Sequence, residues 1–96
     1  MSFKKPNVEF LMEMTKAYLD GELDSVSYSL DFPYEVETRY KELLKEDRVL
    51  AEIIYDCLVE EGVNLYHELS EKEFKDKISK EYEFINDIVE GNVDIL

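Results

Sequence analysis

Apolar and polar positions follow a helical pattern most clearly over residues 49–61, in the middle of the chain. This stretch contains neither Gly nor Pro, and its apolar residues recur at the i, i+3, i+4 spacing of a buried helical face: Val49, Leu50, Ile53, Ile54, Cys57 and Leu58. Three further apolar residues widen that face and leave one polar stripe, formed by Glu52, Asp56 and Glu60. A strand is excluded, because apolar side chains would lie on both of its faces. We therefore predict that residues 49–61 form the central helix of a bundle, with neighbours on several sides.

The same spacing predicts a first helix over residues 8–20. The side-chain oxygen of Asn7 can accept a hydrogen bond from a free N–H of the first turn, so Asn7 is the expected N-cap. Gly21 is suited to the left-handed conformation that ends a helix.

A short second segment is expected over residues 26–31, with Tyr28 and Leu30 facing inward. Pro33 disfavours helical geometry at the residue before it and is itself favoured at a first helical position. The pattern therefore predicts that a new helix, residues 33–45, begins at this proline.

Four consecutive charged residues, 45–48, interrupt the apolar stripe of that helix. We predict a turn or a sharp kink there, although the pattern leaves open whether helices 33–45 and 49–61 are continuous. Gly62 then ends the central helix, and residues 63–69 form a connector.

The last helix has the clearest local start signal in the chain. Ser70 and Glu73 stand three residues apart, as in a capping box, and Leu69 and Phe74 occupy the two positions of a hydrophobic staple. Gly91 is expected to close the helix. Together, these segments predict an all-α fold: a small antiparallel bundle of four to five helices in a single domain, residues 1–96.

Composition restricts the classes of partner. The apolar fraction of 45% is too high for intrinsic disorder, and 24 acidic against 11 basic residues give a net charge of −13. Such a chain lacks the positive charge to neutralise phosphates, so we expect no direct binding to nucleic acid or to an anionic membrane surface. The charge favours either solubility or a basic protein partner.

Two further features of the sequence indicate the cellular compartment. No apolar stretch approaches the roughly 20 residues of a membrane span, and the N-terminus lacks the apolar core of a signal peptide. Cys57 is the only cysteine, so an intrachain disulfide is excluded. We expect a cytoplasmic protein.

Candidate catalytic and metal-binding groups are few. His67 lacks the second His, four residues beyond, that a zinc protease helix requires. Residues 20–31 imitate a calcium-binding loop only loosely, because the Gly and the bidentate Glu of that loop are missing. Cys57 lies on an apolar helical face, where a thiolate is disfavoured, and His67 lies in a different segment. No Gly-rich phosphate loop is present. We predict no metal site, no cofactor and no enzymatic activity.

The polar stripe of the central helix continues into polar and aromatic residues of the connector. We propose this series as a candidate partner-binding surface: Glu52, Asp56, Glu60, Glu61, Asn64, Tyr66, His67 and Glu68. Ordered carboxylates on a rigid helix can bind Lys and Arg side chains through charge-assisted hydrogen bonds. A solvated acidic face would give the same pattern, and the sequence leaves both interpretations open.

The order of these segments also carries a family resemblance. A first helix ends in residues 17–23 (Ala-Tyr-Leu-Asp-Gly-Glu-Leu), an aromatic follows at Tyr28, and the central helix contains residues 53–58 (Ile-Ile-Tyr-Asp-Cys-Leu). The connector then leads into residues 69–74 (Leu-Ser-Glu-Lys-Glu-Phe). Over roughly residues 8–90, this layout resembles the colicin D immunity protein family, small acidic helical proteins that neutralise tRNA-cleaving bacterial toxins.

The resemblance implies a location for the toxin-binding residues. In that family, acidic residues around the end of the third main helix and the following loop occupy the basic tRNA-binding cleft of the toxin. The matching positions here are Asp56, Glu60, Glu61 and Glu68. The chain departs from the family at Phe32-Pro33, which would interrupt the second helix, and in the length of its connector.

The leading hypothesis is therefore a non-enzymatic immunity protein that binds the basic nuclease domain of a cognate toxin, of the kind found with bacteriocins and contact-dependent inhibition systems. The alternative is a small acidic regulatory or adaptor protein with an unrelated basic partner. An enzyme that uses paired carboxylates is the third and least favoured hypothesis. The sequence does not identify the toxin or the oligomeric state.

Overall fold

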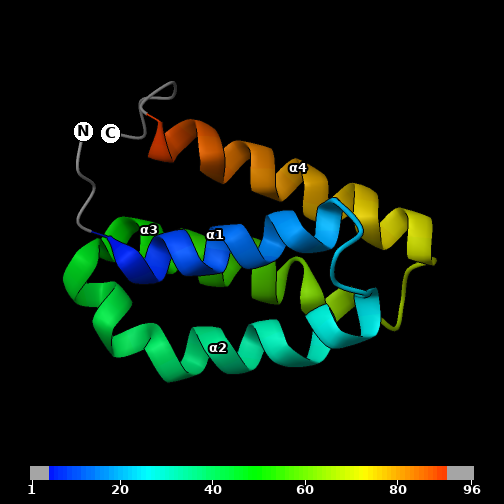
Figure 1. Cartoon of the computed structure of the whole chain (residues 1–96), viewed down its shortest axis with the longest axis horizontal. Helices are drawn as coiled ribbons and strands as arrows, with labels where there is room; N and C mark the ends of the chain where they lie inside the picture. The colour runs from blue at the N-terminus through cyan, green and yellow to red at the C-terminus, as the bar shows by residue number, and fades with distance from the viewer. Residues whose placement is uncertain (1–4, 91–96) are drawn as a thin grey trace.

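The computed structural model describes residues 5–90, and these residues form an all-α bundle (Figure 1). Four α-helices follow one another: α1 (Pro6–Leu19), α2 (Ser25–Glu46), α3 (Arg48–Ile54) and α4 (Glu71–Val89). Helix α3 continues as a π-helical segment, Tyr55–Glu60, and a 3₁₀ turn, Val63–Leu65, lies in the connector to α4. No strand occurs between residues 5 and 90, so the predicted fold class is confirmed.

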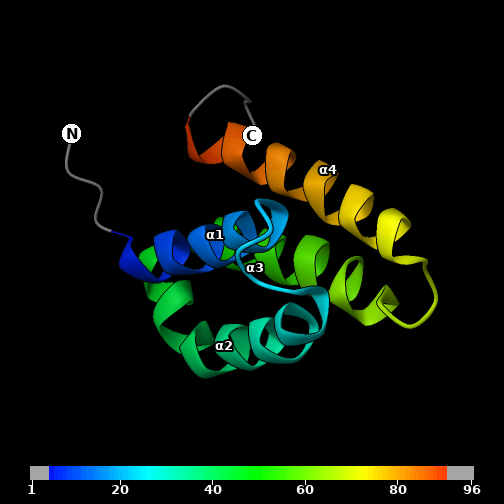
Figure 2. The ribbon, with the colours of Figure 1, turned by 45° about the vertical axis from the view of Figure 1, so that its right-hand side comes forward.

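Each helix packs against the next one in the chain, and α4 returns to α1. In Figure 1, successive helices run in opposite directions, with α1 between α2 and α4 and α3 behind it; the rotated view of Figure 2 shows α3 between α2 and α4. The arrangement is thus an up-down-up-down four-helix bundle. Helix α3 occupies one corner of it, which differs from the predicted central position: Val49 is exposed, and Ile53, Tyr55 and Cys57 are only half-buried.

The buried side chains form one continuous core, to which every helix contributes an inward stripe. Its largest fully buried members are aromatic and branched residues: Tyr28, Phe32, Phe74, Leu11, Leu43, Ile54, Leu58, Ile78 and Ile85. The rings of Tyr18 and Tyr28 stack at a centroid distance of 4.8 Å, and Tyr28 also lies 4.9 Å from Phe32. The hydroxyl groups of Tyr28 and Thr15 form a hydrogen bond of 2.9 Å, which satisfies two polar atoms inside this core.

Helix α2 is continuous through Pro33, so the predicted break at this residue is wrong. A proline inside a helix costs about 3 kcal/mol or more, because it removes one hydrogen bond and clashes with the preceding turn. Phe32 and Val36 on either side of it are fully buried. Each such side chain contributes roughly 1.5–3 kcal/mol, so tertiary packing offsets the cost of the proline.

The continuity of α2 also reverses the predicted orientation of Leu30. Tyr28, Phe32 and Val36 lie four residues apart and face the core, which places Leu30 on the outer side of the same helix. Leu30 is 69% exposed, so its assignment as an inward residue is wrong, whereas that of Tyr28 is confirmed.

A single residue, Asp47, separates α2 from α3. Its backbone is extended, with φ −167°, and its side chain accepts a hydrogen bond of 3.1 Å from the backbone N–H of Leu50. Asp47 therefore ends one helix and caps the next, which confirms the turn predicted within residues 45–48.

The N-terminus of α1 is capped from another helix. Asn7 does not act as the N-cap that we predicted, because Pro6 takes the first helical position and moves the start of the helix towards Lys5. The carboxylate of Glu46, at the end of α2, accepts the backbone N–H groups of Asn7 and Val8 at 3.0–3.2 Å. The Asn7 side chain donates to Glu46 at 2.5 Å and accepts from Arg39 at 2.7 Å.

The end of α1 follows its local signal. Gly21 has a φ of +88°, the left-handed conformation that was predicted. The backbone N–H of Glu22 donates to the carbonyl of Ala17 at 2.9 Å, which satisfies one of the free carbonyls of the last turn.

The second half of the predicted helix 49–61 has wider turns than an α-helix. The backbone N–H of Glu61 donates to the carbonyl of Asp56, five residues earlier, at 2.9 Å. The wider turn brings two consecutive residues, Leu58 and Val59, into the core. It also leads to Gly62, where an added Cβ would lie 2.5 Å from the Leu58 carbonyl oxygen and 2.9 Å from Ile78. Gly62 therefore permits the close approach of this turn to α4.

Helix α4 begins as predicted. The backbone N–H of Glu73 donates to Ser70 Oγ at 3.1 Å, and the backbone N–H of Ser70 donates to Glu73 Oε1 at 3.0 Å. Phe74 is fully buried, and Leu69 packs against the core at its edge. Gly91, the predicted end of the helix, lies outside the described residues.

Candidate functional site

The acidic stripe that runs from α3 along the π-helical segment to its end is exposed along its whole length. We call Glu52, Asp56, Glu60 and Glu61 the acidic ridge; all four side chains are solvent-exposed. Glu52 lies 3.7 Å from Arg48 in a surface ion pair. Within residues 5–90, no ion pair involves Asp56, Glu60 or Glu61. Three of the four carboxylates are therefore open to a partner.

The helix that carries the acidic ridge is well anchored underneath. Leu50, Ala51, Ile54 and Leu58 are almost completely buried against the neighbouring helices. The ridge is therefore held on a packed element rather than on a loop, so little conformational entropy is lost when these carboxylates bind a partner.

The first half of the ridge borders α2. The ring of Tyr40, on α2, meets that of Tyr55 edge-on at a centroid distance of 5.8 Å. The pKa of Tyr40 is raised, first by partial burial and then by the negative charges of Glu52 and Asp56. Glu52 of α3 and Asp56 of the π-helical segment are therefore close enough to Tyr40 of α2 to affect it electrostatically.

The connector residues form a second part of the predicted surface. Asn64, His67 and Glu68 are exposed, whereas Tyr66 is half-buried and packs edge-on against Phe74, at 5.2 Å between ring centroids. The His67 ring lies 5.1 Å from that of Tyr66.

Tyr66 and His67 line an open pocket of about 420 Å³, which the connector forms with the start of α2. Its other lining residues are Ser25, Val26, Leu69 and Glu71. The eight predicted residues therefore do not form one site: four belong to the acidic ridge, Tyr66 and His67 line this pocket, and Asn64 and Glu68 are exposed in the connector outside it.

An apolar stripe on the outer face of α2 was missed by the sequence analysis. Val26, Leu30 and Tyr34 lie at i, i+4 and i+8 of this helix, and they are 54%, 69% and 67% exposed. Exposed carboxylates flank them, among them Asp31 and Glu37. The i+4 spacing would have revealed this stripe if α2 had been continued through the proline.

Glu71 was also missed as a site residue. Its Oε2 accepts a hydrogen bond of 2.6 Å from the Ser25 hydroxyl, which joins the first residue of α4 to the first residue of α2. The sequence contains no local signal for this contact, because the two residues are 46 positions apart.

The environment of Cys57 opposes nucleophilic catalysis. Partial burial, together with the neighbouring Glu81 carboxylate of α4, raises the pKa of the Cys57 thiol to about 11. The thiol is therefore protonated at neutral pH. His67 lies in the connector and contacts Tyr66 rather than this cysteine. In residues 5–90, no group of three or more His, Cys, Asp or Glu side chains is arranged to hold a metal ion.

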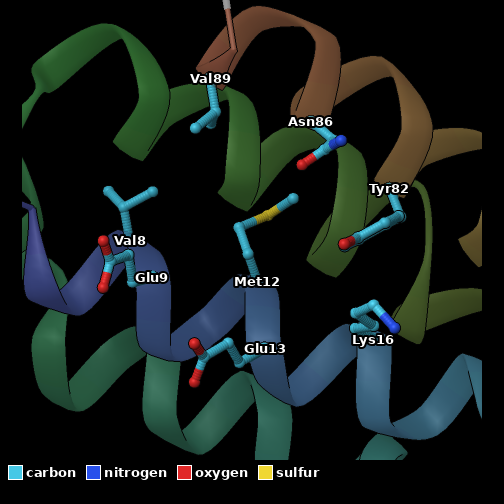
Figure 3. A pocket seen from close by; sticks show the side chains of 8 residues that line it. All are labelled: Val8, Glu9, Met12, Glu13, Lys16, Tyr82, Asn86 and Val89. Atoms are coloured by element: carbon cyan, nitrogen blue, oxygen red, sulfur yellow. The ribbon is translucent and has the colours of Figure 1, made fainter. Parts of the chain in front are cut away.

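A second hollow lies between α1 and α4, with a volume of about 180 Å³ (Figure 3). Figure 3 shows Val8 and Met12 of α1 facing Val89 of α4 across it. Lys16, at one end, forms an ion pair with Asp20 at 2.7 Å. The apolar floor of this hollow brings no catalytic pair together.

The helices of residues 5–90 include none with the length and hydropathy needed to cross a membrane. Comparison of the sequence with protein-family models found no match, and searches among curated proteins and among solved structures found none either.

Proposed function

We propose that this protein is an immunity protein that binds a basic, tRNA-cleaving toxin domain in the cytoplasm and blocks it with the acidic ridge. The observation that carries this proposal is the combination of open and ordered carboxylates. Asp56, Glu60 and Glu61 are exposed and free of ion pairs within the described chain, yet they belong to a turn that is packed through Leu58 and Val59.

The mechanism is occupation of the toxin's substrate site. A nuclease that binds RNA presents Lys and Arg side chains to the phosphates, and carboxylates on a rigid helix can bind the same cations. The net charge of −13 attracts such a cleft before contact, which speeds association. In the complex, the desolvated ion pairs slow dissociation. The inhibitor performs no chemistry in this scheme.

The resemblance of the sequence to colicin D immunity proteins supports the choice of toxin class. Three of the four carried-over positions, Asp56, Glu60 and Glu61, belong to the acidic ridge, and the fourth, Glu68, is exposed in the connector. An unrelated basic protein would use the same carboxylates, so the regulatory or adaptor alternative differs in its partner and not in its surface.

The test uses the genes that flank the one encoding this chain. Each flanking open reading frame is expressed in a bacterial host with and without this protein, and growth and tRNA integrity are measured. We expect one flanking product to cleave tRNA and stop growth, and co-expression of this protein to restore both. If no flanking product cleaves tRNA, or if its cleavage continues in the presence of this protein, the proposal is wrong.

A further inference from the structure

The outer face of α2 and the pocket at its start form one continuous surface, because Val26 belongs to both. Val26 is the first residue of the exposed apolar stripe, with Leu30 and Tyr34 in the next two turns of the helix. Val26 also lines the pocket, beside Tyr66 and Leu69. The surface thus combines the apolar stripe of α2 with the pocket at one end of it.

The side chains that line the pocket are suited to a positively charged side chain. The Ser25 hydroxyl donates to Glu71 Oε2 at 2.6 Å and so fixes the carboxylate at its wall, while Oε1 makes no hydrogen bond or ion pair within residues 5–90. The half-buried ring of Tyr66 offers an aromatic surface, and a cation is attracted to the face of such a ring. Val26 and Leu69 can cover the aliphatic stem of a Lys or Arg side chain.

The aromatic cluster that Tyr66 forms with Phe74 and Tyr18 contains a buried polar group without a partner. Tyr18 is 4% exposed, and its hydroxyl group makes no hydrogen bond within the described part of the chain. Its pKa is raised, first by burial and then by the charge of Glu71 and by Tyr66, both of which line the pocket. Glu71 is therefore the negative charge at this pocket, and the buried Tyr18 hydroxyl has unused hydrogen-bonding capacity.

The protein already holds one arginine in this way. The guanidinium group of Arg39 lies 3.8 Å from the centre of the Phe10 ring and donates to Glu35 at 3.0 Å. An aromatic ring and a carboxylate thus hold a cation together within the bundle, and the pocket offers the same pair to an external side chain.

We propose that this surface docks a basic protein segment in which an Arg or Lys side chain is flanked by apolar residues. The cationic side chain enters the pocket beside Glu71 and Tyr66, and the apolar neighbours cover Val26, Leu30 and Tyr34. This surface shares no residue with the acidic ridge, and the inference rests on the proposed function only for the basic character of the partner.

Charge decides between this occupant and a second copy of the chain. Exposed carboxylates surround the stripe at Asp24, Asp31 and Glu37. Two copies joined through this face would bring these carboxylates together, and each copy carries a net charge of −13. A basic segment removes that repulsion instead.

The test is an NMR titration of the isotope-labelled protein with a blocked Leu-Arg-Leu peptide, with Leu-Gln-Leu as the matched control. We expect the backbone amide signals of Val26, Tyr66, His67 and Glu71 to shift with the first peptide and to stay nearly constant with the second. Because one charge-assisted hydrogen bond is lost in a partly exposed site, Glu71→Gln should weaken binding by about fivefold to tenfold. Glu83→Gln, an exposed carboxylate elsewhere on α4, should change it by less than about twofold.

A second variant separates the apolar contribution from the charge. Leu30→Ser alters only an exposed side chain, so the spectrum of the free protein should keep its dispersion while Leu-Arg-Leu binds more weakly. Equal effects of Glu71→Gln and Glu83→Gln, with shifts spread over all acidic surfaces, would overturn the proposal. Concentration-dependent shifts at Val26, Leu30 and Tyr34 in the absence of peptide would also overturn it, since a second copy would then cover the stripe.

These outcomes do not depend on the identity of the toxin. Peptide binding at the pocket combined with a failed flanking-gene test would retain this inference and reject the immunity function. Protection from a flanking toxin without peptide binding at the pocket would give the reverse result.

Discussion

The carboxylates at the α2–α3 turn and those further along the chain have different roles. Before and at the turn, Glu46 and Asp47 are engaged by the fold: Glu46 accepts backbone N–H groups of α1, and Asp47 caps α3 and pairs with Lys5 at 2.7 Å. Beyond the turn, Asp56 and Glu60 are exposed and make no ion pair within residues 5–90. A carboxylate's place in the sequence does not distinguish the two groups, whereas its hydrogen bonds do. The first group serves stability, and the second is available for binding.

The largest effect on stability should come from the core beneath the open carboxylates. Leu58→Ala removes a fully buried side chain and should lower the free energy of unfolding by about 2–5 kcal/mol, because it leaves a cavity under the ridge. Glu52→Gln on the same helix should change it by no more than about 0.5 kcal/mol. Chemical denaturation of both variants provides the comparison, and the opposite ranking would show that the faces of α3 are assigned wrongly.

The engaged and open carboxylates can be compared directly by truncation. Glu46→Ala leaves two backbone N–H groups of α1 without their acceptor, so we expect a loss of about 1–3 kcal/mol in the free energy of unfolding. Glu60→Ala should cost no more than about 0.5 kcal/mol, because this side chain is exposed. Urea denaturation of the two variants tests this difference. Equal losses in the free energy of unfolding would show that Glu46 and Glu60 do not differ in their contribution to stability.

Local signals account for the parts of the fold that the sequence predicted well. Gly21, the capping box of Ser70 and Glu73, and the charged turn around Asp47 each depend on residues within a few positions of one another. Each could therefore be recognised without knowledge of the tertiary structure.

The failed predictions concern residues whose role is decided by distant partners. The cost of Pro33 is offset by packing of Phe32 and Val36, which α2 makes only in the folded bundle. Asn7 bonds to Glu46, 39 residues away, and not to its own helix. No spacing rule anticipates such contacts, because they depend on which helices become neighbours.

In the candidate site, too, the residues with local sequence signals were predicted and those that depend on distant contacts were not. The exposure of Glu52, Asp56 and Glu60 followed from helical spacing, and the structure has these side chains at the surface. Their binding to a partner stays a prediction. The apolar stripe of α2 and the contact between Ser25 and Glu71 were missed, because the first requires a continuous α2 and the second joins distant segments.

A smaller effect should appear in the pH dependence of stability. Burial acts to raise the pKa of Asp47, but hydrogen bonds from Lys5 and from the backbone of Leu50 outweigh it, so the pKa lies below its ordinary value. A lowered folded-state pKa adds stability above the unfolded value of about 3.9, and this stability is lost as the pH falls through the folded value. Asp47→Asn should therefore lose stability less steeply than the natural protein below about pH 4.

Between neutral pH and about pH 5, acidification should leave stability level or raise it modestly, because the self-repulsion of a chain with net charge −13 decreases. Denaturation curves at a series of pH values test both intervals. Identical acid slopes for the two proteins would contradict the role of Asp47, and a steep loss that begins near pH 6.5 would indicate that other ionised pairs hold the fold.

The central claim is that the open carboxylates contact a basic partner, and dissociation kinetics tests it most directly. The measurement uses a flanking-gene toxin domain of the kind proposed above, and it compares Glu60→Gln and Glu61→Gln with Glu83→Gln at two salt concentrations. Loss of a carboxylate from the interface leaves a buried cation unpaired, so the first two variants should lose about 2–5 kcal/mol of binding free energy, mainly through faster dissociation. Glu83→Gln should alter only the salt-dependent association rate, since it contributes to the long-range field alone. Equal and small effects from all three variants would contradict the account, because the charge would then be a general property of the surface.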